Sequence, residues 1–162
     1  MNDTIADDPQ DWFDNPRLHD WLARQRAAFP AWARDTGQDW DFAPASVDRL
    51  ERLLRSWYST YEDIHAAAAT PRVQVAAWYL GEVQVRHCGT VWKCRPREAL
   101  TEWEYDTPFV TLPEPPVPEE DGKGEEDEEG YVPLCVPQDE IEALFLRGPE
   151  NRLYDVFTRY EH

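Results

Sequence analysis

The stretch from Glu114 to Glu129, EPPVPEEDGKGEEDEE, holds nine acidic residues and one basic residue. The surrounding interval, 113–130, contains four prolines and three glycines, and it has too few apolar side chains to build a core of its own. We therefore predict one long acidic loop over 113–130. Whatever core the chain forms must come from the sequence on either side of this loop.

The acidic excess extends beyond the loop. The 162-residue chain has a formal net charge of −17, and outside Glu114–Glu129 acids still outnumber bases by 24 to 15. A surface of this kind repels nucleic acid and anionic membranes and favours cationic partners. We expect a basic protein partner, no direct contact with nucleic acid and no membrane association; the sequence predicts no oligomeric state.

The length and the aromatic content indicate a single folded domain. Eight Trp, seven Tyr and six Phe are enough for a substantial core, although some of these rings could instead be exposed for binding. We predict an acidic arm over 1–15 and one domain over 16–162. No apolar run approaches the roughly 20 residues that cross a bilayer, and the first residues are acidic and polar. A cytoplasmic protein with reduced thiols at Cys88, Cys94 and Cys135 is expected.

Three helices are predicted before any strand. The first begins at Pro16 with Asn15 as its cap, and Pro30 predicts a break or kink. The second has Ser46 as its cap. Its charged side, which includes Asp48 and Glu51, is expected to face solvent. Its apolar stripe is formed by Val47, Leu50, Leu53, Leu54, Trp57, Tyr58 and Tyr61.

A third helix is predicted from Thr70-Pro71 to about His87, and Gly89 ends it. Its small residues and Gly81 would let another element pack closely. Short strands are expected over 90–94, 109–112 and 131–135, followed by a helix from Pro137 and a short helix over 153–160. There is no βαβ alternation and no internal repeat. The predicted fold class is α+β, with three N-terminal helices, a small, mainly antiparallel sheet and one or two C-terminal helices.

Trp78-Tyr-Leu-Gly-Glu82, followed by Gly89-Thr-Val-Trp92, resembles a group of small bacterial proteins of unassigned function. In that group a helix with a Y-x-G-E motif leads into a short sheet that begins near G-x-x-W. The resemblance covers about residues 70–95. It implies an α+β fold and brings no active site, and the acidic loop is not part of its pattern.

Two patterns have the residue types of metal sites but not the arrangement. His87-Cys88-x5-Cys94, with Cys135, could supply thiolate and imidazole ligands for zinc, but the spacing differs from that of structural zinc knuckles. Glu62-x-x-His65, expected at the end of the second helix, is half of a di-iron motif that needs a second copy. Packing thiols and a polar pair at a helix end are the favoured interpretations. No metal and no cofactor are predicted.

Glu82 lies within the apolar third helix and has two interpretations. A carboxylate there could be a buried general base, or it could pair with Arg86 one turn later, and the pair is favoured. We mark Glu82 and Arg86 as a candidate polar site. No serine has a nucleophile-elbow context and no glycine loop could cradle phosphate, so no catalytic residue is predicted.

These observations favour a non-enzymatic protein-binding module, of the immunity or antitoxin type, that inhibits a basic partner by occluding it. One alternative is a small metal-dependent enzyme using Glu82, His65 or His87. Another is an accessory subunit of a larger bacterial assembly, and a solvated linker is the simplest role for the acidic run. The predicted partner-binding residues are Glu119, Glu120, Asp121, Glu125, Glu126, Asp127, Glu128 and Glu129.

Overall fold

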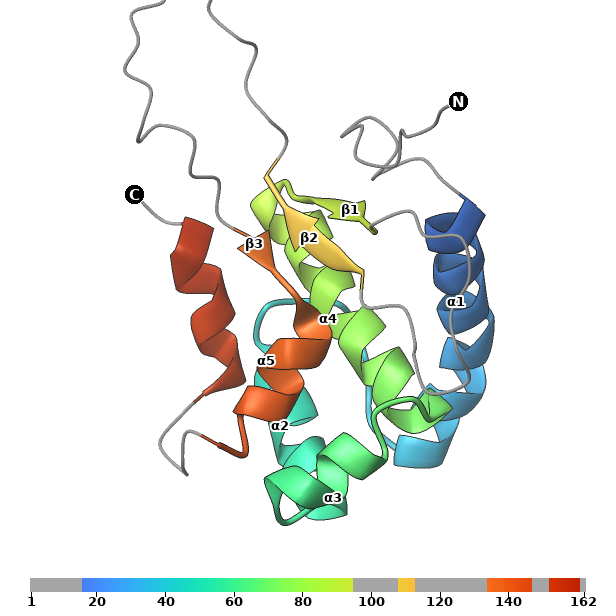
Figure 1. Ribbon diagram of the computed structural model, residues 1–162, viewed down its shortest axis with the longest axis vertical. Helices are drawn as coiled ribbons and strands as arrows, with labels where there is room; N and C mark the ends of the chain where they lie inside the picture. Colours follow the sequence, from blue (N-terminus) through green and yellow to red (C-terminus); the bar gives the residue numbers. More distant parts are fainter. Residues whose placement is uncertain (1–15, 95–107, 113–133, 147–151, 161–162) are drawn as a thin grey trace, which may run out of the picture.

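The computed structural model describes residues 16–94, 108–112, 134–146 and 152–160 (Figure 1). Within these ranges the fold is α+β, as predicted, with helices before and after a three-stranded antiparallel sheet. The elements, in order, are α1 (Pro16–Thr36), α2 (Ser46–Trp57), α3 (Tyr61–Ala66), α4 (Pro71–Cys88), β1 (Val91–Lys93), β2 (Phe109–Thr111), β3 (Leu134–Cys135), α5 (Pro137–Ala143) and the 3₁₀ helix η4 (Leu153–Tyr160).

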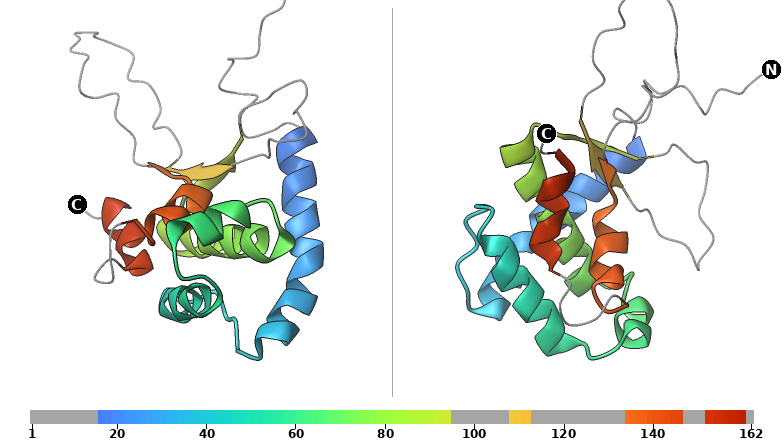
Figure 2. Two further views of the ribbon diagram at one scale, coloured as in Figure 1. Left: turned by 60° about the horizontal axis from the view of Figure 1, so that its bottom comes forward. Right: turned by 90° about the vertical axis from the view of Figure 1, so that its left-hand side faces the viewer.

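Helix α4 is the centre of the fold. Every residue from Val73 to Gln84 is buried, because α1, α5, η4 and the sheet surround the helix (Figures 1 and 2). The predicted bounds are confirmed: Pro71 occupies the first turn, and Gly89 ends the helix with φ +74°, a left-handed conformation that suits glycine. The sequence predicted one apolar face, whereas the structure buries the whole circumference.

The sheet lies across one side of α4 (Figure 2). Its order is β1-β2-β3, with Trp92 opposite Val110 and Val110 opposite Cys135. All three of these side chains are buried and face α4, as the alternation of the pattern requires. The predicted strands are confirmed in position, although Tyr131 to Pro133 lie outside the described residues.

The sequence joined α2 and α3 into one helix, and that prediction was wrong. Helix α2 ends at Trp57, Tyr58 is extended, and α3 begins at Tyr61. The cause is Thr60, whose hydroxyl accepts a hydrogen bond from the Asp63 backbone N–H and so favours a new helix start.

The role predicted for Ser46 was also wrong. The residue that precedes α2 is Ala45, and Ser46 is the first helical residue. The Ser46 hydroxyl donates to the Ala43 carbonyl at 2.6 Å and lies 2.7 Å from the Tyr79 phenol oxygen. It therefore joins α2 to the core rather than closing the end of the helix.

Pro30 does not end α1, which continues to Thr36. Packing of Phe29 and Trp32 against Tyr79 keeps both sides of the proline helical. The helix is therefore not broken at Pro30, and the predicted kink stays a prediction.

The charged side of α2 is not simply solvated. Asp48 accepts two hydrogen bonds from Arg152, at 2.8 and 3.0 Å, and Glu51 accepts one from the Leu153 backbone N–H at 2.8 Å. These contacts fix the start of η4 on α2. They join parts of the chain about 100 residues apart, which helical spacing alone could not reveal.

Candidate functional site

Glu82 and Arg86 form the ion pair that the sequence predicted, at 3.6 Å. The second oxygen of Glu82 accepts a hydrogen bond from Trp92 Nε1 at 2.9 Å. Arg86 also lies over the Phe42 ring, 3.7 Å from its centroid. Both carboxylate oxygens therefore have partners, and the arrangement favours a structural role for the pair.

Gly81 explains why Trp92 can reach Glu82. A methyl group on Gly81 would overlap the six-membered part of the Trp92 indole. The glycine lets the ring lie directly on the α4 backbone, the close approach that the sequence predicted for this position. The G-E and G-x-x-W motifs that carry the family resemblance thus meet in one contact.

His65 contacts a partner that the sequence did not suggest. Its Nδ1 lies 2.7 Å from Glu142 Oε1, which joins α3 to α5. The Tyr61 ring stacks on the imidazole, with centroids 5.3 Å apart. The Glu142 side chain is 10% exposed and that of His65 is 57% exposed, so the carboxylate is buried and the ring meets solvent.

A chain of hydrogen bonds continues inward from Glu142. Gln138 Nε2 donates to the second Glu142 oxygen at 2.7 Å, and Gln74 Nε2 donates to Gln138 at 3.1 Å. Trp21 Nε1 then donates to the Gln74 oxygen at 2.7 Å. This polar chain (Trp21, Gln74, Gln138, Glu142 and His65) connects α1, α4, α5 and α3.

The polar chain is an arrangement of buried polar side chains that sequence reasoning missed. One signal was available: Gln138 and Glu142 are four residues apart and flank Ile141, so they share a side of α5 that must also be buried. Their partners come from distant parts of the chain, which no local pattern identifies.

The His65–Glu142 pair has the geometry of an oriented base. A carboxylate that accepts from Nδ1–H leaves Nε2 as the unprotonated nitrogen of a neutral imidazole. Within the described ranges, the Tyr61 phenol, 3.5 Å from Nδ1, is the only side-chain hydroxyl hydrogen-bonded to His65. The pair could accept a proton from a bound molecule, but no adjacent nucleophile accompanies it there.

The three candidate residues of the enzyme alternative are not brought together. His65 lies on α3, at the end of the molecule away from the C-terminal half of α4 that carries Glu82 and His87 (Figure 1). His87 Nε2 bonds the Phe42 carbonyl at 3.0 Å. The described residues contain no group of three or more His, Cys, Asp or Glu side chains placed to hold a metal ion.

No disulfide links Cys88, Cys94 and Cys135. Cys94 and Cys135 are buried, and Gln84 Nε2 lies 3.4 Å from the Cys135 sulfur. Cys88 is half-buried, and burial raises the pKa of its thiol. A raised pKa leaves less of the reactive thiolate at neutral pH, so this environment fits packing better than chemistry.

The described aromatic residues build the core. Phe29, Trp32, Trp40, Phe42 and Tyr79 form a continuous cluster of rings between α1, α4 and the loop before α2. Burial raises the pKa of Tyr79, although the hydrogen bond between its oxygen and Ser46 and the one that it accepts from the Phe42 backbone N–H partly offset this effect.

Phe42 has φ +62°, a left-handed conformation that is uncommon for residues other than glycine. Its N–H is bonded to Tyr79 and its carbonyl to His87, and these two bonds hold the strained backbone in place. His87, a candidate residue of the enzyme alternative, therefore has a structural contact with the loop before α2.

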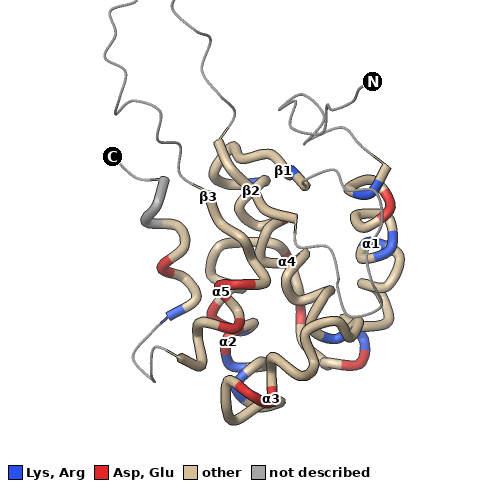
Figure 3. The backbone as a smooth tube through the Cα atoms, in the orientation of Figure 1, with Lys and Arg blue, Asp and Glu red and all other residues tan. Residues whose placement is uncertain are grey.

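The charge is divided sharply along the chain. The described residues carry 13 acids and 12 bases, whereas the remaining segments carry 20 acids and four bases. In Figure 3 both signs are interspersed over the helices. The eight predicted partner-binding acids, from Glu119 to Glu129, all lie outside the described residues. The part of the chain that the structure describes is thus nearly neutral.

No protein-family model, curated protein or solved structure matches this chain. Among the described residues, no helix combines the length and the apolar character that a membrane crossing requires. Function must therefore be argued from the geometry and the charge alone.

Proposed function

We propose that this chain is a cytoplasmic protein-binding module of bacterial type that inhibits a basic partner protein by occlusion, as immunity proteins and antitoxins do. The division of charge is the observation that carries the proposal. A nearly neutral domain, with 13 acids and 12 bases, is joined to segments that hold almost the whole excess of 17 negative charges.

Charge concentrated in this way acts mainly on encounter. At physiological salt an electrostatic field decays over about 8 Å, so a dense group of carboxylates attracts a basic surface far better than the same charges spread out. Glu119 to Glu129 would pair with lysines and arginines of the partner, and the domain would then cover its active surface. The aromatic rings whose burial the structure describes are buried or half-buried, so they are not assigned as anchors.

The test uses a matched pair of variants in the full chain. One replaces the eight acids between Glu119 and Glu129 with Gln or Asn. The control replaces the five aspartates of the arm, Asp3, Asp7, Asp8, Asp11 and Asp14, with Asn. Partners are captured from host lysate at low and high salt, and the association rate of the captured protein is then measured against ionic strength.

We expect one basic partner, and an association rate that falls about tenfold or more at low salt in the eight-acid variant. The salt dependence should flatten in that variant and change less in the arm control. Capture of no basic protein, or equal association rates for the wild-type chain and the eight-acid variant, would contradict the proposal.

A second candidate is a small enzyme that uses His65 as a general base oriented by Glu142. The 2.7 Å contact between the two side chains favours it. A panel of activated esters and amides would test it, with His65→Ala and the surface variant His19→Ala compared with the wild-type chain. Turnover that is lost only in His65→Ala supports the enzyme; equal background rates in all three proteins exclude this role for the pair.

A further inference from the structure

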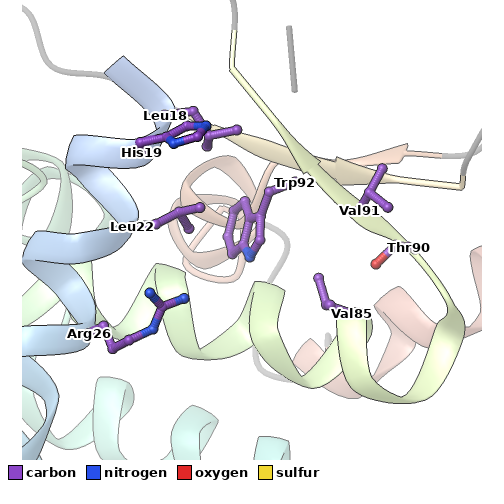
Figure 4. Close-up of a pocket in the computed structure, with 8 residues that line it drawn as sticks. All are labelled: Leu18, His19, Leu22, Arg26, Val85, Thr90, Val91 and Trp92. Atoms are coloured by element: carbon purple, nitrogen blue, oxygen red, sulfur yellow. The ribbon is translucent and has the colours of Figure 1, made fainter. Parts of the chain in front are cut away.

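Helices α1 and α4 and strand β1 line an open pocket of about 410 Å³ (Figure 4). Small-molecule sites commonly have volumes of about 300–1,000 Å³. The apolar part of the wall is formed by Leu18, Leu22, Val85, Val91 and Trp92.

The Trp92 wall is held in place from behind. Gly81 lets the indole lie on α4, and Glu82 accepts the hydrogen bond from its Nε1 at 2.9 Å. Trp92 is 8% exposed, and its ring contacts that of Trp21 in a tilted arrangement with centroids 5.2 Å apart. These contacts make the pocket preformed, because its largest side chain cannot turn away without breaking them.

The charge of the lining is opposite to that of the chain. Acids outnumber bases 33 to 16 in the whole sequence, but the lining contains Arg26 and His19 and no acid. Within the described ranges Arg26 makes no hydrogen bond or ion pair, whereas Arg24 on the same helix bonds Asp20 at 3.1 Å. An arginine in this setting suits a carboxylate or another anionic group.

Thr90 supplies an independent indication of a ligand. The residue is 3% exposed and lines the pocket, and its hydroxyl oxygen has no hydrogen-bond partner among the described residues. Buried hydroxyls almost always have a partner, so an orphan that borders a pocket points to a missing polar group. In Figure 4, Arg26 and Thr90 lie on opposite sides of the Trp92 indole.

We propose that this pocket binds a small organic anion with an apolar middle and a second polar atom at its inner end, such as a medium-chain hydroxy acid. The carboxylate lies at the mouth beside Arg26. The apolar middle lies against Leu22, Val85 and Trp92. The inner hydroxyl or carbonyl hydrogen-bonds Thr90 after a rotation of the threonine side chain, because its hydroxyl oxygen is covered in this structure. This ligand site is independent of the proposed protein partner.

The probes are 8-hydroxyoctanoate and octanoate, titrated into the full chain while methyl resonances of Leu, Val and Ile are followed by NMR. Shifts should concentrate at Leu18, Leu22, Val85 and Val91, and 8-hydroxyoctanoate should bind several-fold more tightly than octanoate. Shifts spread evenly over the core, or none at millimolar probe, would overturn the proposal.

Two variants separate the roles. Arg26→Gln should weaken both probes about fivefold, whereas Arg24→Gln, on the same helix, should leave both unchanged. Thr90→Val, which keeps the shape of the side chain, should remove the preference for 8-hydroxyoctanoate and leave octanoate affinity nearly the same. Equal effects of the two arginine variants, or an undiminished preference in Thr90→Val, would overturn the assignment.

Discussion

The two halves of α4 are fixed by different kinds of contact. In the C-terminal half, Gly81 and Glu82 hold Trp92, which is ten residues away from Glu82 in the chain. In the N-terminal half, Gln74 bonds Trp21 and Gln138, which are 53 and 64 residues away. The first contact joins α4 to β1, the next element in the chain. The second joins α4 to α1 and α5, which are distant in the sequence.

This difference has an energetic consequence. The Gly81–Trp92 contact is mainly one of shape, so a substitution there is felt as overpacking. The polar chain lies in a buried region where each donor and acceptor depends on its neighbour, so removing one member leaves several groups without partners. We therefore expect substitutions in the N-terminal half of α4 to destabilise the fold more than substitutions in the C-terminal half.

The largest effect is expected for Gln74→Leu. This change removes the amide that accepts from Trp21 and donates to Gln138 and to the Ala68 carbonyl, and it should lower the free energy of unfolding by about 3 kcal/mol. Urea denaturation measures it. Gln84→Leu is the comparison on the same helix, because the fully buried Gln84 donates to the Leu80 carbonyl of its own helix and only weakly, at 3.4 Å, to the Cys135 sulfur; it should cost less, about 1.5 kcal/mol. Equal costs would contradict the comparison.

Gly81→Ala comes next, with an expected loss of about 2 kcal/mol, because the new methyl group overlaps the Trp92 ring. In a Trp92→Phe background the same change should cost less, which a double-mutant cycle in denaturant measures. Gly89→Ala serves as a comparison, since its position has open space and costs only the strain of φ +74°, about 1 kcal/mol. Additivity of Gly81→Ala and Trp92→Phe would refute the contact.

Tyr79→Phe should cost about 1.5 kcal/mol, because it orphans the Phe42 N–H that now donates to the phenol at 2.8 Å. Burial raises the pKa of Tyr79 above 10.0 in the folded chain, so the protonated phenol stabilises the fold fully below the unfolded pKa, and this contribution is lost as the pH rises through the folded pKa.

The difference in stability between the wild-type chain and Tyr79→Phe should therefore shrink above pH 10, in melting curves recorded from pH 8 to 11. Tyr154→Phe provides the control for removing a phenol hydroxyl elsewhere. A difference that stays constant across this range would show that Tyr79 is not the titrating group.

The smallest effect is expected for Glu82→Gln. The amide oxygen can still accept from Trp92, and the lost ion pair with Arg86 is 3.6 Å long and half-exposed, so the cost should be about 0.5 kcal/mol. Glu82→Leu should cost more, about 1.5 kcal/mol, because it leaves Trp92 Nε1 unpaired. Similar losses for the two variants would mean that charge, and not the hydrogen bond, holds the indole.

The local rules of sequence predicted most of the fold. Proline at the first turn and glycine after the last turn placed both ends of α4, and alternation placed the strands. These local rules failed at short polar side chains that could form hydrogen bonds in two different ways. Thr60 started a new helix, and Ser46 turned toward Tyr79, because tertiary contacts decide between such uses.

Of the candidate site, only the contacts between residues close in the sequence were predictable. The Glu82–Arg86 pair follows from helical spacing, and its geometry is as expected. His65, in contrast, was seen beside Glu62 in the sequence, while its partner in the fold is Glu142, 77 residues further on. Pairing of that kind depends on how helices pack against each other, and no short segment of a single sequence shows such long-range contacts.

The burial of α4 on all sides also bears on biosynthesis. Helix α5, which covers part of α4, begins at Pro137, about 50 residues after α4 ends at Cys88. At about 5–20 residues per second, a ribosome needs several seconds to cross that interval. During those seconds the apolar surface of α4 that α5 will bury remains exposed. The sequence made in the meantime includes the acidic run Glu114–Glu129, whose repulsion between chains would keep nascent copies apart.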